Sequence, residues 1–323
     1  MARLHAQPRR QMRVRNERRR PEGVALGRRP GERRRRPALL EYGLLFVRLV
    51  KFEHSIFALP FAYAAAFLAE MRIPGFSRMA WITVAMVSAR SLAMALNRLL
   101  DAEIDALNPR TARRELPAGR LTRLQVWVFC LVSLGVLVLA TFHLPVVTRY
   151  LWPIPVAAFY LYPLTKRWTW LCHLFLGATI AIGPVGAWVA VTGAVTWPPF
   201  LLGAVVTAWI AGFDIIYACM DVDFDRGHGI HSLPADHGVS AALWATRLLH
   251  TTAAALLLGV GAVVGGGPVY YLGVLVCAGL LFYENWVVRS RDLSRVGLAF
   301  MTMNGVISVV FLFFTTVAVV LAP

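Results

Sequence analysis

Apolar residues come in blocks of about 20 along most of the chain, and short polar segments separate the blocks. A helix of that length crosses the hydrocarbon core of a bilayer. The pattern predicts an all-α polytopic membrane protein with nine transmembrane helices. The predicted spans are roughly 43–70, 79–99, 122–143, 146–164, 170–192, 199–220, 239–264, 269–288 and 296–321.

Composition supports a single membrane domain over residues 39–323. Of the 323 residues, 58% are hydrophobic and only 15% are charged, and no long soluble block interrupts the spans. Many span positions are Gly or Ala, which allows helices to approach closely in lipid. The four cysteines fall singly in apolar blocks, so we expect small buried side chains in place of disulfides or metal ligands.

Much of the net charge of +16 lies in the first 36 residues, which hold 14 arginines and three glutamates, or 14 − 3 = +11. The rest of the chain carries 16 − 11 = +5, which is ordinary for basic membrane loops and predicts no nucleic-acid partner. Residues 1–38 lack an apolar segment typical of a secretory signal. Their Arg, Pro and Gly content predicts a disordered tail that touches anionic lipid headgroups. Alternatively, the tail reflects a start codon assigned too far upstream.

The basic residues also predict an orientation. The loops after the second, fourth, sixth and eighth spans carry most of the Lys and Arg outside the tail, whereas the opposite loops carry only Arg72, Arg78 and Arg149. Because basic loops stay in the cytoplasm, we expect a cytoplasmic N-terminus and an external C-terminus in a bacterial inner membrane.

Two acidic segments begin inside apolar spans, on the side predicted to be cytoplasmic. NRLLDAEID places Asn97, Asp101 and Asp105 at i, i+4 and i+8, on one face of a helix. DIIYACMDVDFD forms a second stripe, with Asp223 pointing elsewhere. The members of that stripe are Asp214, Tyr217, Asp221 and Asp225.

A single DxxxD segment is more often a solvated helix end, but two such stripes at the ends of two spans indicate a shared functional cavity. Carboxylates packed this closely repel one another, so a cationic partner is expected between them. Carboxylate oxygens suit Mg²⁺, which commonly binds through one or two carboxylates together with substrate phosphates. With basic residues nearby, the implied ligand is a magnesium diphosphate whose lipid tail enters the bundle.

The two segments resemble the NxxxDxxxD and DxxYxxxDxxxD signatures of the UbiA-type intramembrane aromatic prenyltransferases. NPRTARRELPAGRLT resembles the RTxxRPLxxG loop of that family, and YPLTKRWTW resembles its YPxxKRxT segment. The resemblance covers residues 43–321. It implies nine helices around a central cavity, capped by loops on the cytoplasmic side.

The resemblance also implies roles for individual residues. One Mg²⁺ would be held by Asn97, Asp101 and Asp105, and a second by Asp221 and Asp225, while Asp214 and Tyr217 face the same chamber. The reaction implied is transfer of a polyprenyl group from its diphosphate to a ring carbon of a hydroxylated aromatic carboxylate, with Asp214 as a candidate base. The residues expected to contact the substrates are Arg110, Arg114, Lys166 and Arg167 at the diphosphate, and Tyr160 or Tyr162 at the carbocation.

The acceptor is less closely defined. The family members that use 4-hydroxybenzoate carry an RxDKP segment in the first span, where this chain reads RLVKFEHS. Lys51 occupies the position of that Arg, and Arg48 lies one turn earlier. Either residue could bind the acceptor carboxylate, or the two could be an interfacial pair that reaches toward headgroups. Other segments are similar to a branch that prenylates 1,4-dihydroxy-6-naphthoate in a menaquinone route.

Other functional classes fit less well. A cation transporter would place its acids near the midplane, whereas these acids lie on one side of the membrane. A haem or chlorophyll-type acceptor would leave the carboxylate-binding residues without a role. His173 and His250 lie in apolar spans and are expected to be hydrogen-bonded core histidines. Glu284 is an intramembrane acid for which the sequence indicates no partner.

Overall fold

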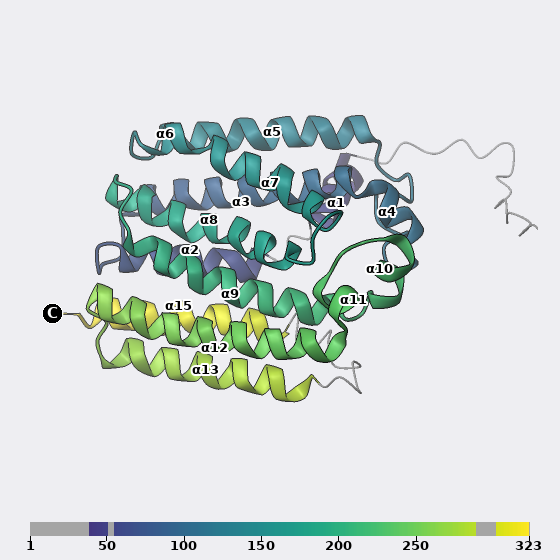
Figure 1. The fold of residues 1–323 in the computed structure, drawn as a ribbon. Coiled ribbons are helices and arrows are strands. Elements are labelled where there is room, and N and C mark those ends of the chain that lie inside the picture. The colour runs from purple at the N-terminus through teal and green to yellow at the C-terminus, as the bar shows by residue number, and fades with distance from the viewer. Residues whose placement is uncertain (1–38, 51–54, 289–301, 323) are drawn as a thin grey trace, which may run out of the picture. The chain divides into compact units, whose positions relative to one another are not determined.

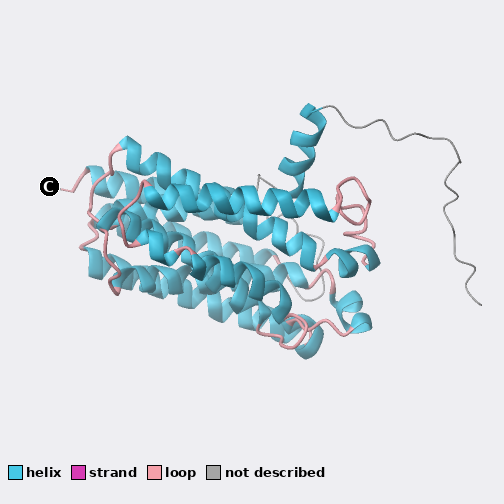
Figure 2. Ribbon diagram, turned by 90° about the horizontal axis from the view of Figure 1, so that it is seen from above, coloured by secondary structure: helices cyan, strands magenta, loops and turns pink. Residues whose placement is uncertain are grey.

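The computed structural model describes residues 39–50, 55–288 and 302–322. All regular structure in these ranges is helical, and no strand occurs in them (Figures 1 and 2). The predicted tail and Lys51 lie outside the described residues, as does the start of the predicted last span.

The long helices run side by side along one axis of a bundle (Figure 1). The helices are α1 (Leu39–Leu49), α2 (Ser55–Leu68), α3 (Phe76–Leu100), α4 (Ala102–Leu107), α5 (Arg123–Phe142), α6 (Thr148–Leu151), α7 (Pro153–Thr165), α8 (Cys172–Thr192), α9 (Pro198–Ala218), α10 (Val222–His228), α11 (Leu233–His237), α12 (Val239–Val264), α13 (Pro268–Val287) and α15 (Asn304–Val320).

Within the described ranges, six helices are long and apolar enough to cross a membrane, namely α3, α5, α8, α9, α12 and α13. The other three predicted spans correspond to the shorter helices α2, α7 and α15, so the count of nine stays a prediction. The predicted span 43–70 contains parts of two helices, α1 and α2. The predicted span 146–164 is interrupted before Pro153, which opens α7, because proline lacks the N–H that would continue a preceding helix.

Helix α9 is the centre of the bundle. In its most apolar window 67% of the residues are buried inside the protein, against 28–50% in the other five long helices. It packs between α8 and α12. The approach of α8 is close because Gly177 lies against the backbone carbonyl of Thr207, where a larger residue would collide.

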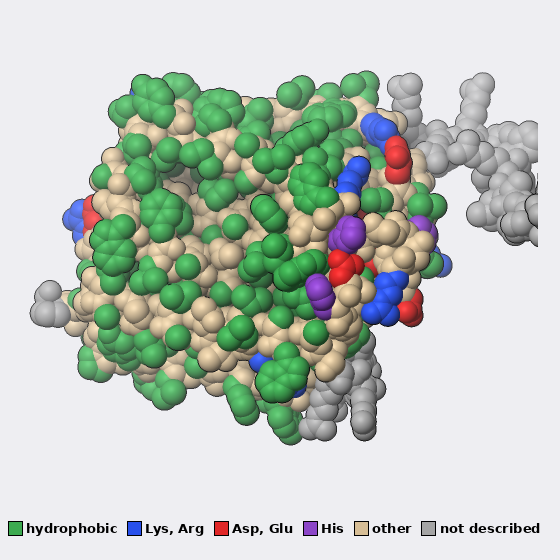
Figure 3. Space-filling view, viewed as in Figure 1, with side chains coloured by type: hydrophobic (Ala, Val, Ile, Leu, Met, Phe, Trp, Pro, Cys, Tyr) green, Lys and Arg blue, Asp and Glu red, His purple; other side chains and the backbone are tan. Residues whose placement is uncertain are grey.

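The short helices α4, α10 and α11 lie together at one end of the bundle (Figure 1). We call this the polar end. In Figure 3 most of the visible acidic, basic and histidine side chains cluster there, one acidic–basic pair lies at the opposite end, and the flank of the bundle is largely hydrophobic. Such a flank suits contact with lipid, so the chain is an integral membrane protein whose polar groups are concentrated at one end.

Candidate active site

A cavity of about 960 Å³ lies inside the bundle between α3, α7, α8 and α9. Its lining includes Asn97 and Asp214, near the polar end, and also Leu144 and Val195, near the opposite end. Most of its lining residues are apolar. A mainly apolar cavity with a few convergent polar groups is typical of a ligand site, and this shape suits a long apolar ligand with a polar head.

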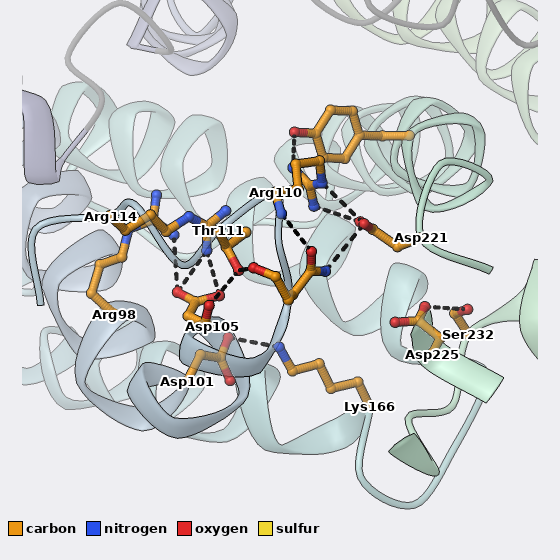
Figure 4. Close-up of polar contacts among 12 residues, drawn as sticks. Arg98, Asp101, Asp105, Arg110, Thr111, Arg114, Lys166, Asp221, Asp225 and Ser232 are labelled. Atoms are coloured by element: carbon orange, nitrogen blue, oxygen red, sulfur yellow. Dashed lines mark hydrogen bonds and ion pairs between the residues drawn. The ribbon is translucent and has the colours of Figure 1, made fainter. Parts of the chain in front are cut away.

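The first acidic motif lies where α3 ends and α4 begins. Asp101 is 3% exposed, and its Oδ2 accepts a hydrogen bond from Lys166 Nζ at 2.7 Å. Burial raises the pKa of Asp101, and Lys166 opposes that shift. Asp105 lies one turn later, where both of its oxygens accept from Arg114 Nη1 at 2.7 Å, and Arg98 lies 4.0 Å away. The motif is therefore buried and closely paired with basic side chains (Figure 4).

The second acidic motif lies between α9 and α10. Arg110 forms a bidentate pair with Asp221, from Nε to Oδ1 at 3.0 Å and from Nη2 to Oδ2 at 2.5 Å. The same guanidinium donates from Nη1 to the Tyr217 hydroxyl at 2.6 Å, and Asn108 Nδ2 donates to Asp221 Oδ1 at 3.3 Å. Because Arg110 and Asn108 follow the first motif, these bonds join the two motifs into one site (Figure 4).

The last acid of the second motif is Asp225, in α10. It is buried, and its Oδ2 accepts a hydrogen bond from Ser232 Oγ at 2.9 Å. Desolvation raises the pKa of Asp225 to about 6, and the Ser232 hydrogen bond opposes this shift. Asp223 is exposed, in line with its predicted orientation away from the other acids.

The expected cationic partner of the acids is supplied by the chain itself, through Lys166, Arg110 and Arg114. Among the described residues, no group of three or more His, Cys, Asp or Glu lies close enough to hold a metal ion. The side chains of the two motifs nevertheless fit Mg²⁺, because they would bind the ion through oxygen atoms and one of these oxygens is free to do so. Asp101 Oδ1 is buried and has no hydrogen-bond partner, and Asn97 lies one turn before it on the cavity wall.

Of the remaining described residues predicted to contact the substrates, one lines the cavity and the others lie outside it. Tyr162 lines the cavity, whereas Tyr160 is 48% exposed and does not line it, as expected for two residues about 200° apart around a helix. Arg167 donates to the backbone oxygen of Leu100 at 2.9 Å, at the end of α3. Arg48 is exposed on α1 and does not line the cavity.

Three polar features were missed in the sequence, and one of them is Arg90. Among the described residues that line the cavity, it is the one Lys or Arg. It lies in α3, seven residues before Asn97, so both side chains fall on one face of the helix. An intramembrane arginine at that spacing from the first motif was the signal that sequence reasoning could have used.

The second missed feature is a pair at the polar end of the cavity, in which His173 Nδ1 lies 2.7 Å from Asp214 Oδ2. The third is the partner of Glu284. This fully buried side chain accepts through Oε1 from Asn304 Nδ2 at 2.8 Å, and Asn304 Oδ1 accepts from Trp209 Nε1 at 2.7 Å.

The comparison that identifies the family is a match of the UbiA prenyltransferase family model to residues 58–321. The chain belongs to the UbiA prenyltransferase family. It is therefore a prenyltransferase, and the resemblance noted in the two acidic motifs is confirmed at the level of the family.

Curated UbiA relatives match most of the chain. A 4-hydroxybenzoate octaprenyltransferase of Marinobacter nauticus is 32% identical over 271 residues, covering 80% of this chain and 89% of that protein. A 4-hydroxybenzoate octaprenyltransferase of Tolumonas auensis is 30% identical over 247 residues, covering 76% of this chain and 86% of that protein.

Solved structures of UbiA homologues share the fold. The apo structure of a UbiA homolog from Aeropyrum pernix K1 has a TM-score of 0.72 at 30% identity, covering 83% of this chain and 97% of that one. A UbiA homolog from Archaeoglobus fulgidus, bound to DMAPP and Mg²⁺, has a TM-score of 0.66 at 18% identity, covering 86% of this chain and 99% of that one.

Proposed function

We propose that this UbiA-family enzyme transfers a polyprenyl group from its diphosphate to a ring carbon of a hydroxylated aromatic carboxylate, in quinone biosynthesis at a bacterial inner membrane. The observation that carries the proposal is the cavity, which is long and apolar and ends beside two joined acidic motifs. Such a shape matches a substrate with a lipid tail and a diphosphate head.

The diphosphate would lie at the polar end. Asn97, Asp101 and Asp105 would hold one Mg²⁺, and Asp221 and Asp225 a second; the Archaeoglobus fulgidus homologue with bound DMAPP and Mg²⁺ supports a site of this kind. Bound there, Mg²⁺ would neutralise negative charge that develops on the leaving diphosphate.

Three basic side chains would bind the diphosphate as well. Lys166, Arg110 and Arg114 each hold a carboxylate oxygen in the structure described here. Phosphate oxygens accept the same charge-assisted hydrogen bonds, and the guanidinium fork of Arg110 suits bidentate contact. Arrival of the diphosphate would therefore transfer these donors from carboxylate to phosphate, where they favour departure of the diphosphate.

The cavity walls would protect the allylic carbocation. The apolar lining excludes water, which would otherwise capture the cation. Tyr162 is placed to stabilise positive charge through its ring, since it lines the cavity and Tyr160 does not.

The acceptor carboxylate would bind Arg90. We prefer Arg90 to Arg48, because Arg90 is in the cavity wall and Arg48 is exposed outside it. Lys51 lies outside the described residues and stays a prediction. A guanidinium binds a carboxylate through two parallel hydrogen bonds and fixes the plane of the ring. The carboxylate would thereby orient the acceptor ring inside the cavity.

The named relatives favour 4-hydroxybenzoate as the acceptor, and 1,4-dihydroxy-6-naphthoate is the alternative. The test is a competition assay, in which the purified protein receives Mg²⁺, a polyprenyl diphosphate and both acids at equal concentration. We expect prenylated 4-hydroxybenzoate as the main product. Mainly prenylated naphthoate would assign the alternative acceptor, and release of no diphosphate with either acid would contradict the proposal.

A further inference from the structure

His173 has a defined hydrogen-bonding state at the polar end of the cavity. It lies in the first turn of α8 and is 3% exposed. Its Nε2 lies 3.3 Å from the backbone nitrogen of Leu233, which can only donate, so Nε2 carries the lone pair. The proton of the neutral ring is therefore on Nδ1, and it is donated to Asp214 Oδ2 at 2.7 Å.

Asp214 faces the cavity in which the acceptor would bind. It lines the cavity, and its side chain is 25% exposed, in contrast to the 4% of the His173 side chain behind it. It lies two turns before Asp221 on the chain, so it is separated from the acids proposed to hold Mg²⁺. One carboxylate oxygen is held by His173, and the carboxylate borders the space where the ring would bind.

Residues 231–233, at the start of α11 and just before it, contact both His173 and the residues proposed to bind the diphosphate. Three consecutive residues each contact a different part of the site. His231 N donates to the Lys166 carbonyl at 2.7 Å, Ser232 Oγ donates to Asp225 Oδ2 at 2.9 Å, and Leu233 N donates to His173. The same short segment thus holds residues at the diphosphate and, through His173, the carboxylate at the acceptor.

We propose that His173 is a positioning residue that holds Asp214 as the proton acceptor for the hydroxyl of the aromatic substrate. The inference rests on the proposed function and adds a specific role for two residues. His173 itself touches no substrate; it fixes one oxygen of Asp214 and so aims the carboxylate into the cavity.

Each bond and proton in this step can be followed. As the ring carbon bonds to the allylic carbon, the carbon–oxygen bond to diphosphate breaks and its electron pair leaves with the diphosphate. Asp214 takes the hydroxyl proton, which gives a neutral dienone. The ring proton at the attacked carbon then passes to the diphosphate, Asp214 returns its proton to the oxygen, and the ring becomes aromatic again.

Two substitutions separate the two contacts of His173. In His173→Asn the amide nitrogen occupies the position of Nδ1, so the donor to Asp214 is kept and the acceptor for Leu233 is lost. In His173→Gln the amide oxygen reaches the position of Nε2, so the contact with Leu233 is kept and the donor to Asp214 is lost. His143→Gln is the matched control, because His143 ends α5 at the opposite end of the bundle.

The measurements are kcat and KM for each substrate in lipid nanodiscs, with whichever of the two acids the wild type uses, and the affinity for geranyl S-thiolodiphosphate. We expect kcat of His173→Gln to fall about 10- to 100-fold, as for other residues that orient a reactive group. We expect His173→Asn to stay within about threefold of wild type, Asp214→Asn to fall about 100-fold or more, and the thiolodiphosphate affinity to change less than about twofold in all three.

The outcomes distinguish this inference from the proposed function. If the wild type is active and His173→Asn and His173→Gln have the same kcat, the role of His173 is overturned and the proposed function still holds. Loss of thiolodiphosphate affinity in parallel with turnover would also overturn it, because the residue would then support the whole site. A wild type that binds the thiolodiphosphate but prenylates neither acid would contradict both.

Discussion

Replacing Arg90 by Gln tests how the acceptor is bound. A charge-assisted hydrogen bond is worth about 1.5–3 kcal/mol. Arg90 is the one Lys or Arg among the described lining residues, so within that lining no other cation can replace it. Since about 1.4 kcal/mol corresponds to tenfold, we expect Arg90→Gln to lower kcat/KM for 4-hydroxybenzoate by about 10- to 140-fold.

The assay compares 4-hydroxybenzoate with phenol, which lacks the carboxylate. Wild type should prefer 4-hydroxybenzoate by a factor of the same size, and Arg90→Gln should lose that preference because phenol never used the guanidinium. Arg78→Gln is the control, since Arg78 lies at the far end of α3 and donates to Val191 O at 3.1 Å. Equal losses for both acceptors, or the same loss of preference from Arg48→Gln, would refute the assignment.

Three further predictions concern the acids and the metal. Asp221→Asn should reduce turnover about 100-fold or more while exposed Asp223→Asn stays near wild type; equal rates would remove Asp221 from the site. Chelation by EDTA should stop turnover and added Mg²⁺ should restore it, and turnover that persists in EDTA would contradict the metal requirement. Glu284→Leu should lower the free energy of unfolding in mixed micelles by about 1–2 kcal/mol, because Asn304 loses an acceptor, and Glu284→Gln should cost less; equal costs would argue against that hydrogen bond.

The fold could be predicted from the sequence where a span is one uninterrupted apolar helix. Apolar runs of about 20 residues located all six long helices, because burial in lipid is the dominant constraint on such segments. The run before Leu68 and the run around Pro153 were each predicted as a single helix, but the first contains parts of both α1 and α2 and the second is interrupted before Pro153. Hydrophobicity alone does not register a break, because both halves of a broken span are equally apolar.

The site could be predicted in part. The spacing of the two acidic motifs indicated a shared chamber, and the structure joins them through Arg110 and Asp221, which are 111 residues apart. The partners of the individual acids could not be predicted, since they depend on how the loops fold back on the helix ends. The pair of His173 and Asp214 could not be predicted either, because it depends on how α8 packs against α9.

Arg90 is a different case, because the sequence contained the relevant signal. A charged residue inside an apolar span is costly, and its spacing of seven from Asn97 placed it on the cavity face of α3. The choice between Tyr160 and Tyr162 required the structure, since residues two apart point to opposite sides of a helix and the sequence does not determine which side of α7 faces the cavity.

The most direct test of the proposed function is the identity of the product. The full chain in lipid nanodiscs, supplied with Mg²⁺, a polyprenyl diphosphate and ring-labelled 4-hydroxybenzoate, is analysed by mass spectrometry and compared with Asp101→Asn. We expect a carbon-prenylated 4-hydroxybenzoate from wild type and none from Asp101→Asn. Unchanged 4-hydroxybenzoate from folded wild-type protein, or equal product from the variant, would contradict the proposed function.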